Sequence, residues 1–384
     1  MYAAVQQMID SCTNGKYNDV EGYDERVSSM KNDGKATIRD IASRCQTSPS
    51  TVSRVMNGNT RISEGTRKRV LDAAAELGYI PNPFAKSLRS RTTRIVGVFV
   101  NALTPAFETT LGFLSSLSEC LEEHGYTASI CIIGINAEKE RYYYEMMITL
   151  RACAIIKIVN CSDSQIDQIC TIPIFYVYSY PMNAEKSTQV YRIETDNYGA
   201  GYKAGSELVR LGCRRIAEVR LISQSTDYPF ARHLGLMQSL YDSEARYAEE
   251  LSIVCTRNDF GAILEEIEKK LSTTQPADGY FCSSDVMALA LLESLNFHGY
   301  DIPRRVKIIG CNDMSVSLHS IKRISTIRHR TKELCDATVE TMVRVLNGEK
   351  PTLAMQRQIF PTDLITRETT VEGIQSDGSS QMAD

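Results

Sequence analysis

The chain has 384 residues, of which 43% are hydrophobic, and its formal net charge is −4 at pH 7. This length allows two or three domains with sizeable cores. No apolar run reaches about 18 residues, and the N-terminal stretch has no basic segment followed by an apolar one, which excludes a transmembrane helix and a secretory signal. The twelve cysteines form no C-x-x-C pair, which favours reduced thiols over disulfides or a zinc site. We therefore expect a cytoplasmic protein.

Basic residues are concentrated in one short block. Between Lys35 and Arg94 the sequence has twelve Lys or Arg and four Asp or Glu, whereas the rest of the chain has 31 basic and 43 acidic residues. A small basic block joined to a larger acidic body indicates nucleic-acid contact confined to the block. The alternative is a solvated charged surface.

The first 80 residues divide into a leader and three short predicted helices. Residues 1–34 are polar and without periodicity, so we expect a disordered leader, with Met30 as an alternative start. Within residues 36–80, Thr37 and Asp40 have the spacing of a capping box. The third helix is expected to begin near Ser63 and to end at Gly78.

The second predicted helix lies in the segment "TSPSTVSRVMNGN" (47–59). Ser48 can cap its N-terminus and Pro49 suits the first helical position. One narrow stripe is apolar, and the opposite face has small polar side chains and Arg54. Two helices joined by the tight turn at 46–48 predict a helix-turn-helix, in which small residues let the second helix enter a major groove about 12 Å wide. Arg54 could contact a guanine edge or a phosphate.

Beyond Arg94 the pattern changes to alternating strands and helices. Continuous apolar runs are typical of strands covered on both faces, and helical patterns lie between them, which predicts parallel sheets. The length of this region favours two sub-domains. The runs span residues 94–100, 154–159, 174–178, 215–222, 279–284 and 306–312, and the helical patterns lie near 106–124, 137–151, 197–211, 230–242, 258–271, 285–298 and 331–347.

Three motifs within residues 36–100 resemble the LacI/GalR family of transcriptional regulators: T-V-S-R-V-x-N-G, R-V-L-x-A-A-x-E-L-G-Y and P-N-x-x-A-x-S-L-R. The resemblance continues to about Thr369. It implies an N-terminal all-α helix-turn-helix domain with a hinge helix, followed by an α/β periplasmic-binding-protein-like core of two parallel-sheet sub-domains. It also implies a repressor that binds a pseudo-palindromic double-stranded DNA operator as a homodimer, with no enzymatic activity and no cofactor.

The resemblance gives the proline-rich segment 81–93 a role as a hinge helix. In the family a leucine, here Leu88, wedges into the minor groove at a flexible base step, and an alanine, here Ala85, packs beside it. A flexible linker is the alternative. The DNA-binding residues expected on this basis are Thr37, Ser48, Pro49, Ser50, Thr51, Ser53, Arg54, Asn57, Asn82, Ala85 and Leu88.

The core implied by the resemblance spans residues 94–367, with a flexible tail at 368–384. The chain is expected to cross between the sub-domains near residue 212, near 319–325 and near 350–357. A small polar effector, sugar-like or another metabolite, is expected between them. The corresponding effector-binding residues are Phe107, Asp196, Arg232, Ser284, Asp285 and Asn312.

Several of these positions depart from the family pattern or have an ordinary structural explanation. Asn312 stands where an aspartate commonly accepts two sugar hydroxyls, and an amide offers only one acceptor together with a donor. Helix capping is the alternative for Asp196 and Asp285, and Phe107 could belong to the core. Thr104, Ala106 and Ser284 are further departures from the family pattern.

Other signals are weak. The glycines of "GAGYKAG" (199–205) lie inside a predicted helix, which argues against a dinucleotide-binding loop. The five histidines show no metal-ligand spacing, and no nucleophile motif is present. Two alternative functions remain: a ligand-independent DNA-binding regulator with a degenerate cleft, and a soluble small-molecule receptor without DNA function. The sign of the response, the operator and the choice between dimer and tetramer stay open.

Overall fold

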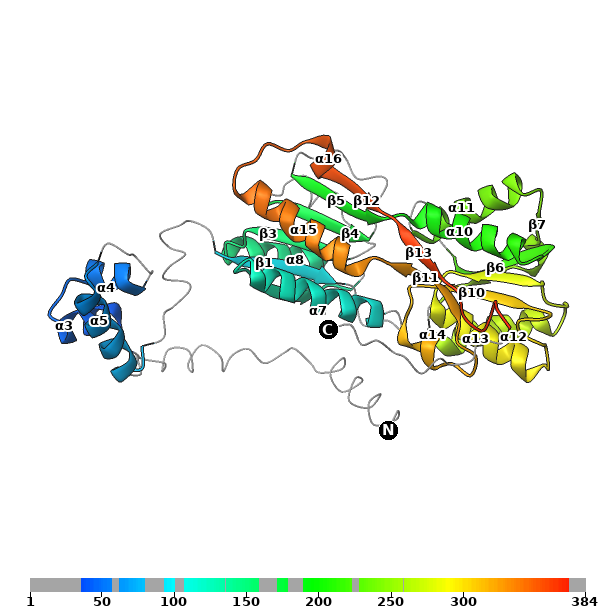
Figure 1. The fold of residues 1–384 in the computed structure, drawn as a ribbon, viewed down its shortest axis with the longest axis horizontal. Coiled ribbons are helices and arrows are strands. Elements are labelled where there is room, and N and C mark those ends of the chain that lie inside the picture. Colours follow the sequence, from blue (N-terminus) through cyan, green and yellow to red (C-terminus); the bar gives the residue numbers. More distant parts are fainter. Residues whose placement is uncertain are drawn as a thin grey trace. The chain divides into compact units, whose positions relative to one another are not determined.

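The computed structural model describes residues 36–56, 62–79, 93–100, 107–134, 136–158, 171–178, 189–222, 228–257 and 259–372 (Figure 1). The chain divides into two compact units, residues 1–86 and 87–384. The leader 1–34, the segment 81–92, Asn57 and the C-terminal residues 373–384 lie outside the described residues. In the described part, no helix is long and apolar enough to cross a membrane.

The first unit is built of three helices, α3 (Ile38–Arg44), α4 (Pro49–Met56) and α5 (Glu64–Glu76). The predicted capping box at the start of α3 is confirmed, since the side chain of Thr37 accepts from the Asp40 N–H while the Asp40 carboxylate accepts from the backbone of Thr37. The helices share one small core, which includes Ile41, Val52, Val55, Val70 and Ala74.

The second unit contains two lobes, each with its own sheet. The first lobe has a six-stranded sheet in the order β12-β5-β4-β3-β1-β2, and its strand pairs are all parallel. Two helices, α7 (Phe107–Glu123) and α15 (Thr331–Leu346), share a core with one face, and α8 (Ala137–Thr149) packs on the other. The short α16 (Leu353–Gln356) precedes β12. The strands are β1 (Ile95–Val100), β2 (Thr127–Ile132), β3 (Ala154–Ile158), β4 (Ile174–Tyr178), β5 (Val190–Thr195) and β12 (Arg357–Phe360).

The second lobe has a seven-stranded sheet in the order β13-β11-β10-β9-β6-β7, with β8 also paired to β6. All pairs are parallel except β13, which runs antiparallel to β11. The strands are β6 (Arg215–Leu221), β7 (Arg246–Tyr247), β8 (Ile253–Cys255), β9 (Gly279–Cys282), β10 (Lys307–Cys311), β11 (Ser325–His329) and β13 (Thr362–Ile365).

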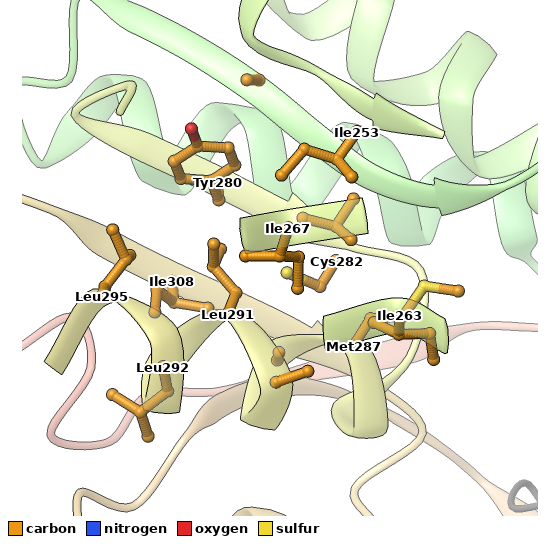
Figure 2. Packing of buried hydrophobic residues seen from close by; sticks show 14 of the residues in the cluster. Ile253, Ile263, Ile267, Tyr280, Cys282, Met287, Leu291, Leu292, Leu295 and Ile308 are labelled. Carbon is orange, nitrogen blue, oxygen red and sulfur yellow. The ribbon is translucent and has the colours of Figure 1, made fainter. Parts of the chain in front are cut away.

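Helices cover both faces of the second sheet. α10 (Asn197–Arg210) and α11 (Tyr228–Asp242) share a core with one face. α12 (Phe260–Leu271) and α13 (Asp285–Phe297) cover the other, where Ile263, Ile267, Met287 and Leu291 meet Tyr280 and Ile308 of the strands (Figure 2). The short helices η1 (Glu249–Leu251) and α14 (Ser315–His319) complete the lobe. The predicted fold class of helix-turn-helix plus two α/β sub-domains is confirmed.

The chain crosses between the lobes at other places than expected. β5 ends in the first sheet at Thr195 and α10 already packs on the second lobe, so the first crossing lies near residue 196 and not near 212. The second falls at residue 330 between β11 and α15, and the third at residue 361 between β12 and β13, beyond the expected 319–325 and 350–357. The glycine at 212, with φ of +85°, only ends α10 inside the second lobe. The first and third crossings do carry local signals, the helix-capping Asp196 and Pro361, but a sequence does not show which sheet the following segment joins.

The folded core also extends past its expected end at residue 367. Thr369 is fully buried, and its backbone carbonyl accepts from the N–H of Ile308 on β10. The hydroxyl of Thr370 lies 2.6 Å from that of Ser325 on β11. The Thr369 hydroxyl also accepts from the Ser325 N–H at 2.8 Å and donates to the Ile308 carbonyl at 2.7 Å, so residues 368–372 form part of the second lobe. The expected flexible tail cannot begin before residue 373.

Candidate nucleic-acid interface and effector site

Helix α4 has one buried stripe and one face of hydroxyl groups. Val52 and Val55 are buried in the core of the first unit. At the N-terminus of the helix, Ser48 Oγ accepts from the Thr51 N–H at 3.1 Å and lies 2.7 Å from Ser50 Oγ. These hydroxyls are short, so the backbone at the start of α4 can approach a flat or concave polyanion closely, and the helix N-terminus itself favours phosphate.

The exposed positions of α4 include Pro49, Ser50 and Arg54, while Thr51 and Ser53 are half-buried. Arg54 has no ion-pair partner among the residues that the structure describes. Arg44 of α3 provides a contrast, because its guanidinium lies 3.2 Å from the carboxylate of Glu76. A cation without an acidic partner on an exposed helix face is the group expected to meet DNA.

Five of the predicted DNA-binding residues are not among the described residues of this exposed hydroxyl face: Thr37 lies at the start of α3, and the other four are not described. The side chain of Thr37 is used in the capping box of α3, where its Oγ1 donates to Asp40 at 2.7 Å. Asn57, Asn82, Ala85 and Leu88 lie outside the described residues.

In the second unit, Arg232 of α11 is the centre of a buried polar cluster where the two lobes meet. Only 3% of the residue is exposed. Its Nε donates to Asn197 Oδ1 at 2.9 Å, and its Nη1 donates to the carbonyl of Ser283 at 2.6 Å. Its Nη2 lies 3.3 Å from Asn312 Oδ1 and 3.2 Å from His329 Nε2. The structure therefore brings together Arg232 and Asn312, two of the residues expected in the effector site.

His329, at the end of β11, was not predicted. Its Nδ1 lies 2.9 Å from Thr195 Oγ1, and its Nε2 lies 2.9 Å from Asn312 Oδ1. Burial, and then the positive charge of Arg232, lower the pKa of His329 to about 3, so the imidazole is neutral at physiological pH. Asn312 has φ of +105°, an unusual backbone conformation for a side-chain-bearing residue that often marks functional positions.

Asp196 and Asn197, at the first crossing, make different contacts. Asp196 caps α10, and its Oδ1 accepts from the Gly199 N–H at 2.7 Å. The neighbouring Asn197 is the residue that faces Arg232, and sequence reasoning missed it. The helix-capping alternative for Asp196 therefore describes its contacts in this structure.

Ser284 and Asp285 are also engaged in local structure. Ser284 caps α13 by accepting from the Met287 N–H. Asp285 is fully buried, and its two carboxylate oxygens accept from Thr326 Oγ1 at 2.6 Å and from the Met314 N–H at 2.7 Å. Burial raises the pKa of Asp285 to about 7 despite these two bonds. Asp285 thus braces the segment that carries Asn312 and presents no surface to a ligand in this state.

The remaining predicted effector residue, Phe107, is the first residue of α7, and its side chain is not described. The residues that prediction missed, Thr195, Asn197 and His329, all lie at or directly after the carboxyl end of a strand. In open parallel sheets this edge is where ligands bind, so the strand ends were the available signal.

The glycine-rich segment of α10 has a packing role and not a nucleotide-binding one. A Cβ at Gly201 would lie 1.8 Å from the backbone carbonyl oxygen of Arg232, and a Cβ at Gly235 would lie 1.9 Å from that of Tyr198. The backbones of α10 and α11 are therefore in direct contact. This contact fixes the backbone of Arg232 against the start of α10, where Asn197 lies.

Comparisons with known proteins agree with both units. A model of the lacI family of bacterial regulatory proteins matches residues 37–82, and a model of the periplasmic binding protein-like domain matches residues 206–370. An HTH-type transcriptional regulator of Lachnoclostridium phytofermentans is 27% identical over 344 residues, which cover 87% of this chain and 99% of that protein. The ribose operon repressor of Halalkalibacterium halodurans is 25% identical over 89% of this chain and 99% of its own length.

Solved structures show the same fold. The lac repressor dimer bound to operator and the anti-inducer ONPF superposes with a TM-score of 0.77 at 20% identity, covering 88% of this chain and 99% of that chain. A complex of the transcriptional regulator CelR with cellobiose superposes with a TM-score of 0.65 at 23% identity, covering 87% of this chain and 100% of that chain.

Proposed function

This chain belongs to the LacI family of transcriptional regulators, and on that premise we propose that it represses transcription from a pseudo-palindromic operator. It binds that operator as a homodimer and responds to a small polar effector held between its two lobes. The chain is a DNA-binding regulator and not an enzyme.

The observation that carries DNA recognition is the exposed face of α4. Its short hydroxyl side chains allow close approach to base edges, and Arg54 has no acidic partner among the described residues. We propose Ser48, Pro49, Ser50, Thr51, Ser53 and Arg54 as groove contacts, and Asn57 as a further DNA contact. Thr37 and Asn82 are proposed as further DNA contacts, and Leu88 is proposed to wedge into the minor groove with Ala85 packed beside it.

Two exposed apolar surfaces support the homodimer. A groove of about 490 Å³ lies between α13 and α14, and among its lining residues Phe297 is 84% exposed and Ile321 is 76% exposed. On the first lobe, Ile130 of the edge strand β2 is 54% exposed, with Leu111 of α7 also exposed. Apolar side chains that gather around one exposed groove often mark a protein–protein contact. A second copy of the chain would cover them, and the lac repressor structure with the same fold is a dimer.

The dimer is tested by analytical ultracentrifugation of Phe297→Ser and Ile321→Ser. Both variants are expected to shift the chain toward monomer. Tyr241→Ser is the matched control, because Tyr241 is 81% exposed on α11, away from this groove. If both variants remain dimers, the α13–α14 surface is not part of the dimer interface.

The effector site is proposed at Arg232 and Asn312, where the carboxyl ends of strands from both lobes converge. The buried guanidinium suits an oxygen-rich or anionic ligand group. Asp196, Ser284 and Asp285 enter this proposal only as residues that hold the site in shape, and Phe107 remains a proposed contact from α7.

The experiment for DNA recognition is a selection of random duplex DNA on the purified chain at fixed salt, because phosphate contacts make affinity salt-dependent. We expect a palindromic consensus that is lost in Leu88→Ala and relaxed at one position in Arg54→Ala. Arg44→Ala serves as control, since that arginine is paired with Glu76. Failure to enrich any sequence, with the folded chain intact, would refute the proposed function.

The effector is tested with the selected operator. Sugars and small organic acids are titrated into the complex, and Arg232→Lys is compared with the native chain because lysine keeps the charge but not the two-pronged geometry. A compound that changes operator affinity in the native chain, but not in Arg232→Lys, supports the site. If no compound acts, the ligand-independent regulator becomes the better description.

A further inference from the structure

Four buried side chains at the crossings form a closed circuit of hydrogen bonds between the lobes. Thr195 Oγ1 lies 2.9 Å from His329 Nδ1, and His329 Nε2 lies 3.2 Å from Arg232 Nη2. Arg232 Nε donates to Asn197 Oδ1 at 2.9 Å, and Asn197 Nδ2 donates to the Thr195 carbonyl at 3.4 Å. The circuit begins and ends at Thr195. Such networks act cooperatively in a low-dielectric interior.

Within this circuit the contact between Thr195 and His329 joins the two sheets directly. Thr195 is the last residue of β5 in the first sheet, and His329 is the last residue of β11 in the second. A change in the angle between the lobes moves these two residues relative to each other. Their hydrogen bond therefore ties the end of one sheet to the end of the other, and its geometry depends on how the lobes are oriented.

We infer that His329 is a positioning residue that couples the effector-binding arginine to the orientation of the two lobes. The inference rests on the proposed function, because it takes Arg232 as the group that meets the effector. A ligand that accepts hydrogen bonds from the Arg232 guanidinium competes with His329 Nε2 and Asn312 Oδ1 for the hydrogen atoms of Nη2. The resulting change in hydrogen bonding reaches Thr195 through the other nitrogen of the same ring, and so reaches the first lobe.

The chemistry of the imidazole suits this task. A neutral ring has one donor and one acceptor nitrogen. When Nε2 accepts from Arg232, Nδ1 donates to Thr195 Oγ1, and when Nε2 donates to Asn312 Oδ1, Nδ1 accepts from the Thr195 hydroxyl. The ring is buried, and Tyr178 of β4 lies edge-on to it with 5.7 Å between the ring centres. An imidazolium would place a second positive charge 3.2 Å from the guanidinium, so the coupling operates with the neutral ring.

The test removes one hydroxyl at a time from the full chain. Thr195→Val deletes the partner of His329 Nδ1 and keeps the shape of the side chain. Thr195→Ser restores the hydroxyl. Thr331→Val is the matched control, because Thr331 Oγ1 lies 3.4 Å from Tyr178 OH, and β4 and α15 both belong to the first lobe. His329→Gln provides a second route to the same break.

Lobe orientation is measured first, as the distance between two spin labels. Because the chain has twelve cysteines, the labels are attached to unnatural amino acids with a ketone group, which replace Tyr142 of α8 and Tyr241 of α11. Both positions are exposed and lie on different lobes. We expect Thr195→Val and His329→Gln to broaden or shift the distance distribution, with Thr195→Ser and Thr331→Val unchanged. Equal distributions in all five proteins would overturn the coupling, whether or not the chain binds DNA.

Operator affinity is measured second, on the sequence selected by the native chain. Thr195→Val is expected to change that affinity by at least about fivefold, the lower end of typical allosteric coupling, while Thr195→Ser restores it. A change within about twofold, equal to that of Thr331→Val, would overturn the coupling. Absence of any operator for the native chain refutes the proposed function instead, and the distance measurement then decides the inference alone.

Discussion

Replacing Asp285 by asparagine should stabilise the second unit relative to the native chain, by an amount that grows as the pH rises. The folded pKa of this carboxyl is about 7, whereas an aspartate in an unfolded chain has a pKa of roughly 3.9. A raised carboxyl pKa means that the fold favours the protonated form. The corresponding stability is fully present below about pH 4, is lost at about 1.4 kcal/mol per pH unit as the pH rises from there, and is gone once the pH has passed the folded pKa of about 7.

An amide at residue 285 removes this loss. Its oxygen can accept from the Met314 N–H, and its NH2 can donate to Thr326 Oγ1, because a hydroxyl can reverse its role. Between about pH 5 and about pH 8.5 the native chain should lose about 3 kcal/mol from this carboxyl alone. The free energy of unfolding of Asp285→Asn, relative to the native chain, should therefore rise by about the same amount.

The measurement is urea unfolding of both proteins at several pH values, followed by tyrosine fluorescence. Asp259→Asn is the control, because a hydrogen bond from the Ala262 N–H lowers the pKa of Asp259 at the start of α12. The stability that this hydrogen bond gives is lost only as the pH falls through the lowered pKa of Asp259. The difference in free energy of unfolding between Asp259→Asn and the native chain should therefore stay constant between about pH 5 and about pH 8.5. A flat difference for Asp285→Asn as well would refute the argument that burial destabilises the ionised carboxylate.

Three other substitutions test packing, capping and buried charge. Gly201→Ala places a methyl group 1.8 Å from the Arg232 carbonyl oxygen and should destabilise the second unit by about 3 kcal/mol, read from the urea midpoint. Thr37→Ala removes the capping box of α3 and should cost the first unit about 1 kcal/mol in thermal unfolding followed by circular dichroism. Glu140→Ala removes the carboxylate 2.8 Å from the buried Lys157 ammonium and should cost about 3 kcal/mol in urea unfolding. A loss below about 1 kcal/mol for the first or the last would show that the surroundings relax more than their burial suggests.

The fold could be predicted wherever buried residues form a continuous apolar run in the sequence. The strands buried on both faces, such as β1 and β10, appear as continuous apolar runs and were predicted within a residue or two. Strands without such a run were missed. β2 is an edge strand with exposed Ile130, and β13 is a short antiparallel edge of mixed composition, so neither produces a run of buried residues.

The candidate site was predicted only in part, for a physical reason. Arg232 and Asn312 stand out because their residue types and positions match a known pattern. His329 and Thr195 acquire their meaning from a contact between residues 134 positions apart in the sequence. Asp285 matches a pattern too, but its neighbours Thr326 and Met314 use both of its oxygens. A sequence shows the type of a side chain but not whether its polar atoms are already satisfied.

The order of the strands has a consequence for the synthesis of the chain on the ribosome. β12 is the edge partner of β5, and β13 is the edge partner of β11, yet both strands lie in residues 357–365. Neither sheet can complete its edge until residues 357–365 have left the ribosome. The strands β5 and β11 then wait with unpaired backbone groups, which are the usual starting points of misassembly. A nascent chain that stalls before residue 357 would carry two open edges at once.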